Sequence, residues 1–361
     1  MIKNNLITTL FRPEVLALSA YHVADATGLI KLDAMENPYT WSDEVKHAWL
    51  NALKDCELNR YPDPEAKQLC ATIKQVYGIK EEFSVLLGNG SDEIIQLLLM
   101  ALTPNAHVLS TTPSFVMYKQ ISDSLGLNYH GVSLQSDFDL NKSAMLAAIA
   151  EYQPSVIFIA YPNNPTGNLF NEETILAIIK ASNGLVVLDE AYAPFANASF
   201  ITRLGQYNNL LVMRTVSKLG LAGLRLGYLV GLPDIIEQLN KIRLPYNINI
   251  LTQASANFAL SYPHLFEPQT EAICDERTRL LNELNALDGI QAFDSAANFI
   301  LFRTPENKAT DIFLSLKQQG VLIKNLSPQG GLLTDCLRVT VGTPEENSAF
   351  LAALQQSLIT V

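Results

Sequence analysis

The 361-residue chain has little positive charge, few cysteines and no long apolar run. Its 25 Lys and Arg are outnumbered by 36 Asp and Glu, and the net charge of −11 argues against a nucleic-acid partner, because binding a polyanion needs a basic surface. The 4 cysteines lie far apart and the 5 histidines are scattered, so neither a disulfide framework nor a metal site is indicated. The longest apolar stretch, IIQLLLMAL, is about half of a membrane span, and the start of the chain lacks a continuous apolar h-region. We therefore expect a cytoplasmic protein that acts on small molecules and binds no membrane.

The chain instead contains short β-branched runs that alternate with amphipathic helical stretches. This alternation is typical of βα units around a mainly parallel sheet and predicts an α/β fold. The candidate strands of this sheet are VLLGN, HVLSTTP, NYHGVSL, SVIFIAYP, LVVLDEAY, LLVMRTVS and LRLGYLVG. The expected helices between them include residues 91–102, 141–150 and 171–182.

The pattern changes in the last third of the chain. A long helical stretch near residues 265–287 is followed by the candidate strands NFILFRT, GVLIK and CLRVTVG, with one helix between the first two and another at the end. This arrangement predicts a smaller α+β domain. We expect an N-terminal arm over residues 1–35 that contributes to the small domain, a large domain over 36–251 and the small domain over 252–361.

The residues that follow the predicted strands are the place to look for a ligand, because ligands of open α/β sheets bind beyond the carboxyl ends of the strands. After VLLGN come Gly90, Ser91 and Asp92, and then a helix. Backbone N–H groups and a hydroxyl at a helix N-terminus suit a phosphate, although plain helix capping is the commoner reason for such a turn.

Two further strand ends carry charged side chains. The very apolar strand LVVLDEAY ends on Asp189, with Tyr192 shortly after it, and a buried carboxylate needs a cationic or hydrogen-bonding partner. The strand LLVMRTVS ends on Ser217 and Lys218, and Arg225 follows in the same glycine-containing segment.

Together these residues match the chemical needs of one cofactor, pyridoxal 5′-phosphate. Its aldehyde needs a lysine, its ring nitrogen an aspartate, its phenolic oxygen neutral donors, and its phosphate a helix N-terminus with an arginine. The chain has one candidate for each need, in sequence order, at successive strand ends.

These motifs also carry a family resemblance. The segments YPNNPTG, VVLDEAY, SKLGLAGLRLG and CLRVTVGTPEE, with NRYPDPE and GNGSDEII upstream, resemble the fold-type I, class-II pyridoxal-phosphate-dependent aminotransferases, and most closely the histidinol-phosphate aminotransferases among them. The likeness covers nearly the whole chain, and the ordered set of motifs is far more specific than any one of them. It implies the fold-type I architecture and an active homodimer.

The resemblance implies a role for each matching residue. Lys218 would form the Schiff base and shuttle the proton, Asp189 would pair with the pyridinium nitrogen, and Tyr192 would act with them beside the phenolic oxygen. The remaining cofactor contacts would come from Gly90, Ser91, Asp92, Ser217 and Arg225 at the phosphate, Asn164 at the phenolic oxygen, Phe115 on the ring face, and Tyr61 of a neighbouring subunit.

The substrate residues are also implied by the resemblance. Arg338 would grip the anionic end of the substrate, which is a carboxylate of glutamate or the phosphate of histidinol phosphate. Lys324 stands where the closest relatives have an arginine; it keeps the charge but loses the bidentate fork. Tyr21, Asn37 and Tyr246 match positions near the substrate pocket.

The resulting hypothesis is an enzyme of histidine biosynthesis. It would convert L-histidinol phosphate and 2-oxoglutarate to 3-(imidazol-4-yl)-2-oxopropyl phosphate and L-glutamate by ping-pong kinetics. An aromatic amino acid aminotransferase and a decarboxylase of a phosphorylated amino acid remain alternatives. A ligand sensor fused to a DNA-binding segment is disfavoured, because we find no basic N-terminal segment and the catalytic set is complete.

Overall fold

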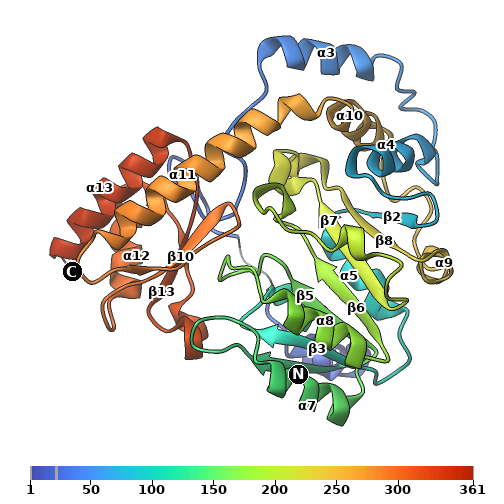
Figure 1. Ribbon diagram of the computed structural model, residues 1–361, viewed down its shortest axis with the longest axis horizontal. Coiled ribbons are helices and arrows are strands. Elements are labelled where there is room, and N and C mark those ends of the chain that lie inside the picture. Colours follow the sequence, from blue (N-terminus) through green and yellow to red (C-terminus); the bar gives the residue numbers. More distant parts are fainter. Residues whose placement is uncertain (1, 21–22, 361) are drawn as a thin grey trace.

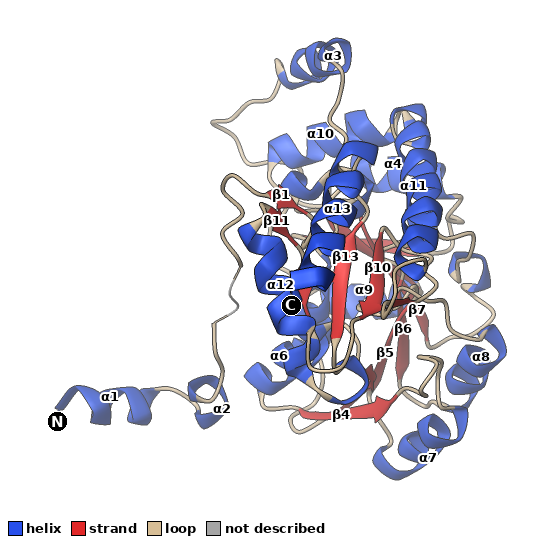
Figure 2. Cartoon of the chain, turned by 90° about the vertical axis from the view of Figure 1, so that its left-hand side faces the viewer, coloured by secondary structure: helices blue, strands red, loops and turns tan. Residues whose placement is uncertain are grey.

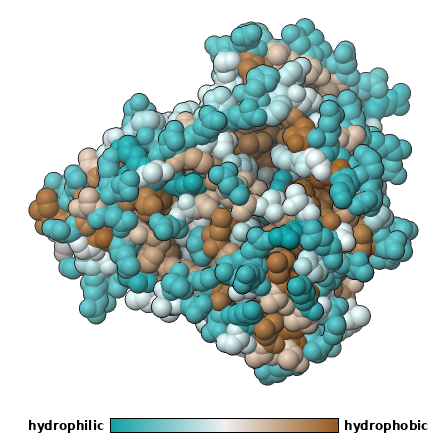
Figure 3. Space-filling view, viewed as in Figure 1, coloured by the Kyte–Doolittle hydropathy of each residue, from teal (hydrophilic) through white to brown (hydrophobic). Residues whose placement is uncertain are grey.

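The computed structural model describes residues 2–20 and 23–360 of the chain, which form two lobes (Figure 1). The large lobe is built around a seven-stranded sheet, and the small lobe around a four-stranded sheet, within the part of the chain that is described. The long helix α11 (Glu267–Asn285) runs from the large lobe toward the small one. Figure 3 shows a mostly hydrophilic surface on the same face, interrupted by separate apolar patches.

The large sheet has the strand order β2-β8-β7-β6-β5-β3-β4. Its strands are β2 (Ser84–Gly88), β3 (His107–Thr112), β4 (Asn128–Ser133), β5 (Val156–Ala160), β6 (Leu185–Asp189), β7 (Leu210–Thr215) and β8 (Gly227–Gly231). Only β8 runs against its neighbours; the remaining pairs of this sheet are parallel. Each predicted strand of the sheet is present, and the α/β class is confirmed.

Helices cover both faces of this sheet. Side chains alternate along each strand, so Ile157 of β5 packs into one apolar core while its neighbour Phe158 packs into another. Strands buried on both faces are apolar throughout, as the segment VIFIA of β5 illustrates. The first core includes residues of α4 (Lys67–Tyr77), α7 (Lys142–Tyr152), α8 (Glu172–Ala181) and α10 (Ile250–Leu260), and the second those of α5 (Ser91–Met100), α6 (Val116–Leu125) and α9 (Pro233–Asn240).

The small lobe has the strand order β12-β13-β10-β9 and a separate pair of strands, β1 and β11. Its elements are β1 (Ile30–Lys31), β9 (Gln291–Ala292), β10 (Phe299–Arg303), α12 (Ala309–Gln318), β11 (Val321–Leu322), β12 (Lys324–Asn325), β13 (Cys336–Thr340) and α13 (Pro344–Thr360). The prediction of a single strand at GVLIK was wrong. Its first half pairs with β1 from the N-terminal segment and its second half with β13, so the run is divided between two sheets.

The N-terminal segment has two short helices, α1 (Ile2–Leu10) and α2 (Pro13–Leu16). α2 packs against α6 of the large lobe, whereas α1 projects away from the molecule (Figure 2). Its later part pairs with the small lobe through β1, whereas α3 (Asp43–Leu53) packs against α10 of the large lobe. The predicted boundary after residue 251 falls inside α10, which belongs to the core of the large lobe. The division into an arm and two domains stays a prediction.

Candidate active site

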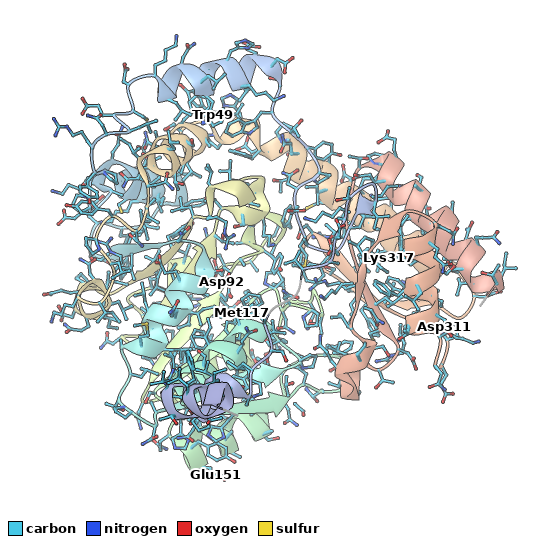
Figure 4. All side chains as sticks on the ribbon, turned by 180° about the vertical axis from the view of Figure 1, so that it is seen from behind. Trp49, Asp92, Met117, Glu151, Asp311 and Lys317 are labelled. Atoms are coloured by element: carbon cyan, nitrogen blue, oxygen red, sulfur yellow. The ribbon has the colours of Figure 1, made fainter. Side chains whose placement is uncertain are left out.

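The carboxyl ends of β2, β3, β5, β6 and β7 point to the same edge of the large sheet, where they border a cavity of about 230 Å³. In Figure 4, Asp92 and Met117 mark the starts of α5 and α6 near the middle of the molecule. The cavity brings together a set of the predicted cofactor residues. They are Ser91, Asp92, Phe115, Asn164, Asp189, Tyr192, Ser217, Lys218 and Arg225.

The turn after β2 has the form of an anion cradle. Gly90 has a φ of 85°, a conformation that residues with a side chain rarely adopt, and its Cα faces the guanidinium of Arg225. The next residue, Ser91, begins α5, and its helix N-terminus points N–H groups at the cavity side of the turn. Arg225 lies with Nη2 3.5 Å from Oδ2 of Asp92. These donors fit a phosphate group.

Asp189 is buried at the end of β6, with 4% of its surface exposed. Its Oδ2 accepts a hydrogen bond of 2.6 Å from the hydroxyl of Tyr118, and its Oδ1 accepts one of 3.1 Å from the backbone N–H of Ala191. Burial raises the pKa of Asp189 to about 6, although both hydrogen bonds favour the charged form. A carboxylate held in this way fits a protonated ring nitrogen.

Lys218 lies on the turn that follows β7, and its Nζ donates a hydrogen bond of 3.2 Å to the backbone oxygen of Ala34. Burial, followed by the positive charge of Arg338, lowers the pKa of Lys218 to about 8. A substantial fraction of this amine is therefore neutral near pH 8. A neutral amine is the form that attacks an aldehyde or accepts a proton.

Asn164 joins the cofactor cavity to a neighbouring one. Its Nδ2 donates to the hydroxyl of Tyr192 at 3.1 Å, and its Oδ1 accepts from Nη1 of Arg338 at 2.5 Å. The second cavity, of about 210 Å³, shares Met35, Phe115 and Asn164 with the first.

The second cavity contains two cations. Lys324 of β12 and Arg338 of β13 both line it, and the two residues are directly opposite each other in the antiparallel pair. Directly opposite residues have their Cβ atoms about 5 Å apart, so both side chains can reach one anion. Arg338 also donates to the backbone oxygen of Asp33 at 3.1 Å.

Residues 33–37, here called the strap, connect the two lobes at this point. Backbone oxygens of the strap accept hydrogen bonds from Lys218 of the large lobe and from Arg338 of the small lobe. Within the strap, the N–H of Met35 donates to the hydroxyl of Thr340 at 2.9 Å, which adds a contact to the small lobe.

Several predicted site residues lie outside both cavities. Asn37 of the strap donates to the backbone oxygen of Leu219 at 3.3 Å and to Gln269 of α11 at 3.0 Å, so its amide is bound to the turn beside Lys218. Tyr61 and Tyr246 stack on each other with ring centroids 4.5 Å apart. Tyr21 lies outside the described residues. The roles of these residues stay predictions.

Sequence reasoning missed Tyr118 and the backbone contacts of the strap, of which it named only Asn37. Tyr118 follows Phe115 by one helical turn, and that spacing was the only available signal that both side chains face the same site. Burial and the charge of Asp189 raise the pKa of Tyr118 well above its usual value. The hydroxyl therefore keeps its proton and donates a hydrogen bond to Asp189. The strap acts through backbone oxygens, which no residue pattern reveals.

No group of three or more His, Cys, Asp or Glu side chains in residues 2–20 and 23–360 could hold a metal ion. No helix in the same residues has the length and apolar character that crossing a membrane requires.

Comparison with known proteins identifies the family. Residues 27–354 match the model of the aminotransferase class I and II family. The chain belongs to this family.

Individual relatives give a narrower name. The chain is 58% identical to histidinol-phosphate aminotransferase 2 of Nitrosococcus oceani, over 95% of this chain and 96% of that protein. It is 49% identical to histidinol-phosphate aminotransferase 2 of Cupriavidus pinatubonensis, over 99% of each. A solved histidinol-phosphate aminotransferase of Sinorhizobium meliloti in complex with pyridoxal-5′-phosphate matches with a TM-score of 0.87, at 23% identity and over 98% of each chain. The predicted family, fold-type I architecture and aminotransferase class are confirmed.

Proposed function

We propose that the protein transfers the amino group of L-histidinol phosphate to 2-oxoglutarate, giving 3-(imidazol-4-yl)-2-oxopropyl phosphate and L-glutamate, as a step of histidine biosynthesis. The observation that carries this proposal is the pair of cations, Lys324 and Arg338, directly opposite each other in the cavity next to the cofactor residues. Two cations suit a doubly charged phosphate better than a single carboxylate. The relatives described above support the same substrate.

Pyridoxal 5′-phosphate is the cofactor of this reaction. The turn at Gly90, with Ser91 and Arg225, would hold its phosphate, and Asp189 its ring nitrogen. When bound, the cofactor carries the amino group between the two substrates and withdraws electrons from the substrate Cα. Asn164 and Tyr192, which are hydrogen-bonded to each other, would hold the phenolic oxygen.

The chain itself supplies the proton transfer. The amine of Lys218 is neutral above about pH 8, so it can take the proton from the substrate Cα and deliver it to C4′ of the cofactor. Arg338 holds the anionic end of either substrate, because it lines the second cavity and is fixed there by Asn164 and Asp33. One site that binds the two substrates in turn accounts for ping-pong kinetics.

We also propose that the active unit is a cytoplasmic homodimer. Tyr61 is 80% exposed and lies outside the cofactor cavity of its own chain, which is the arrangement expected of a side chain that completes the site of a second copy. Tyr246 stacks on Tyr61 and would support it at that interface. The cytoplasm is the compartment we expect for a biosynthetic enzyme of amino-acid metabolism.

A substrate panel tests the proposal against its alternatives. We expect histidinol phosphate to have the highest kcat/KM, with glutamate formed from 2-oxoglutarate and no release of CO₂. A preference for phenylalanine would establish an aromatic aminotransferase, and CO₂ from a phosphorylated amino acid would establish a decarboxylase. Either result would overturn the proposed substrate while leaving the cofactor assignment intact.

A further inference from the structure

A buried carboxylate and a largely buried guanidinium lie behind the cofactor cavity and have no part in the proposed reaction. The carboxylate of Glu190, which is fully buried, pairs with the guanidinium of Arg214. Nη2 and Nε of Arg214 lie 2.7 Å and 2.9 Å from Oε2 of Glu190. The hydroxyl of Ser199 donates to Oε2 at 2.8 Å, and the backbone N–H of Phe200 donates to Oε1 at 2.5 Å. Both oxygens of the carboxylate therefore have partners.

The pair stands where two strands of the sheet end. β6 and β7 are parallel, and their last paired residues are Asp189 and Met213. The pairing continues one step further, because the N–H of Glu190 donates to the oxygen of Met213 at 2.8 Å. Glu190 and Arg214 thus occupy the next position of the same register. One of these strands ends on Asp189, and the other leads directly to Lys218.

The pair faces away from the cofactor. Successive side chains of a strand point to opposite faces of the sheet, and Asp189 lines the cavity whereas Glu190 does not. On the far face, the guanidinium of Arg214 lies 5.2 Å from the ring centroid of Tyr77, which stacks in turn on Tyr228 of β8. Any influence on the cofactor must therefore pass through the backbone of the two strand ends.

Stability alone is a weak reason for such a pair. Desolvation of two buried charges largely offsets their attraction, and apolar residues of similar size often replace a buried ion pair without loss of stability. What the pair does define is geometry, because two nitrogens of Arg214 donate to one oxygen of Glu190 and so fix two adjacent strand ends relative to each other.

We propose that Glu190 and Arg214 are positioning residues that hold Asp189 and Lys218 at the separation that the cofactor ring requires. The proposal rests on the proposed function, because it needs pyridoxal 5′-phosphate in the cavity between them. It adds two residues that do not touch the cofactor or the substrate.

The test uses the full chain with Glu190→Met and Arg214→Met combined, so that no buried charge is left without a partner. The matched control combines Glu172→Met and Arg203→Met, which removes a half-exposed ion pair of the same lobe. We measure the dissociation constant of pyridoxal 5′-phosphate, the pH titration of the visible absorbance of the bound cofactor, and the unfolding temperature of the cofactor-free protein.

We expect the Glu190/Arg214 double variant to unfold within about 5 °C of wild type but to bind the cofactor on the order of ten- to a hundredfold more weakly, with a displaced absorbance titration. The control should match wild type in all three measurements. Arg214→Lys keeps the charge but loses the planar guanidinium with its two donating nitrogens. It should weaken cofactor binding less than the double variant does.

Wild-type affinity and an unchanged titration in the double variant would overturn the proposal. If the double variant does not fold, Arg214→Lys decides in its place. Wild-type cofactor affinity and an unchanged absorbance titration in that variant would overturn the proposal. Failure of the proposed function looks different. A different substrate would change the substrate panel but none of these three measurements, and failure of the cofactor assignment would leave wild-type protein itself with no cofactor bound to Lys218 after borohydride reduction and peptide mapping.

Discussion

The two neighbouring cavities are built in different ways. The cofactor cavity lies at the ends of parallel strands. Its Asp189 is buried, its Lys218 is partly buried, and hydrogen bonds hold both. The second cavity lies between the lobes: residues of the large lobe line one side, and the antiparallel strands β12 and β13 of the small lobe supply its two cations, the partly buried Lys324 and the buried Arg338. The difference supports the proposed division of tasks, in which residues of the large lobe carry out the chemistry and cations of the small lobe select the anion.

The largest effect is expected at Lys218. Lys218→Ala should abolish turnover and covalent attachment of the cofactor, while phosphate-anchored binding at the turn of Gly90 remains. Peptide mapping after borohydride reduction checks the attachment, with Lys180→Ala as a surface-lysine control. A pyridoxyl label on another lysine would contradict the assignment.

A smaller but still large loss is expected at Asp189. Asp189→Ala removes the buried counter-charge of the ring nitrogen and should lower kcat on the order of a hundredfold or more, the scale known for removal of one preorganised electrostatic group. Asp189→Asn keeps the shape of the side chain but not its charge, so kcat should fall by nearly as much. A folded Asp189→Ala protein within about tenfold of the wild-type rate would contradict this role.

In the second cavity, Lys324→Ala should weaken transition-state binding of histidinol phosphate by about 1.5 to 3 kcal/mol, the range for a hydrogen bond to a charged group. The kcat/KM for phenylalanine should change far less. Arg338→Ala should instead slow both half-reactions, because in the proposed site this arginine also binds a carboxylate of glutamate. Values of kcat/KM for both amines decide, with Lys317→Ala on α12 as the control. Equal losses for the two amines would refute selective phosphate binding by Lys324.

The smallest expected effect connects the two cavities. The pKa of Lys218 is lowered to about 8, so the amine is protonated below that pH and neutral above it. The rate of cofactor attachment to the cofactor-free protein should rise about tenfold per pH unit below 8 and level off above it. Arg338→Gln should move this inflection to higher pH, because the arginine's charge helps to depress the pKa. Stopped-flow absorbance between pH 6 and 10 measures both curves, and an inflection that stays in place would show that the cavities are electrostatically independent.

Sequence patterns predicted the large lobe better than the small one, for a physical reason. Strands such as β5 are buried on both faces and leave continuous apolar runs, whereas β1 and β9 are two residues long and leave no pattern. The run GVLIK looked like one strand, because its division depends on partners distant in the sequence.

The same contrast holds within the site. The predicted residues of the cofactor cavity, such as Ser91, Asp189 and Lys218, lie at or after strand ends of the large sheet and could be named in advance, whereas Ala34, Met35 and Glu36 of the strap could not. Tyr118 could not, because its hydrogen bond to Asp189 joins two elements that are 71 residues apart. The contact of Lys218 with the strap spans 184 residues and uses a backbone oxygen, which is common to every residue type.

The strap has a consequence for redesign of this enzyme. Its backbone oxygens hold Arg338 and Lys218 together, so a substitution that moves the arginine would also disturb the lysine. Lys324 contributes its charge from the neighbouring strand and can be exchanged without displacing a strap contact. A library aimed at new amino donors would therefore vary Lys324 first and leave Arg338 unchanged. Substrate specificity could then change while the position of Lys218, and with it the proton transfer, is preserved.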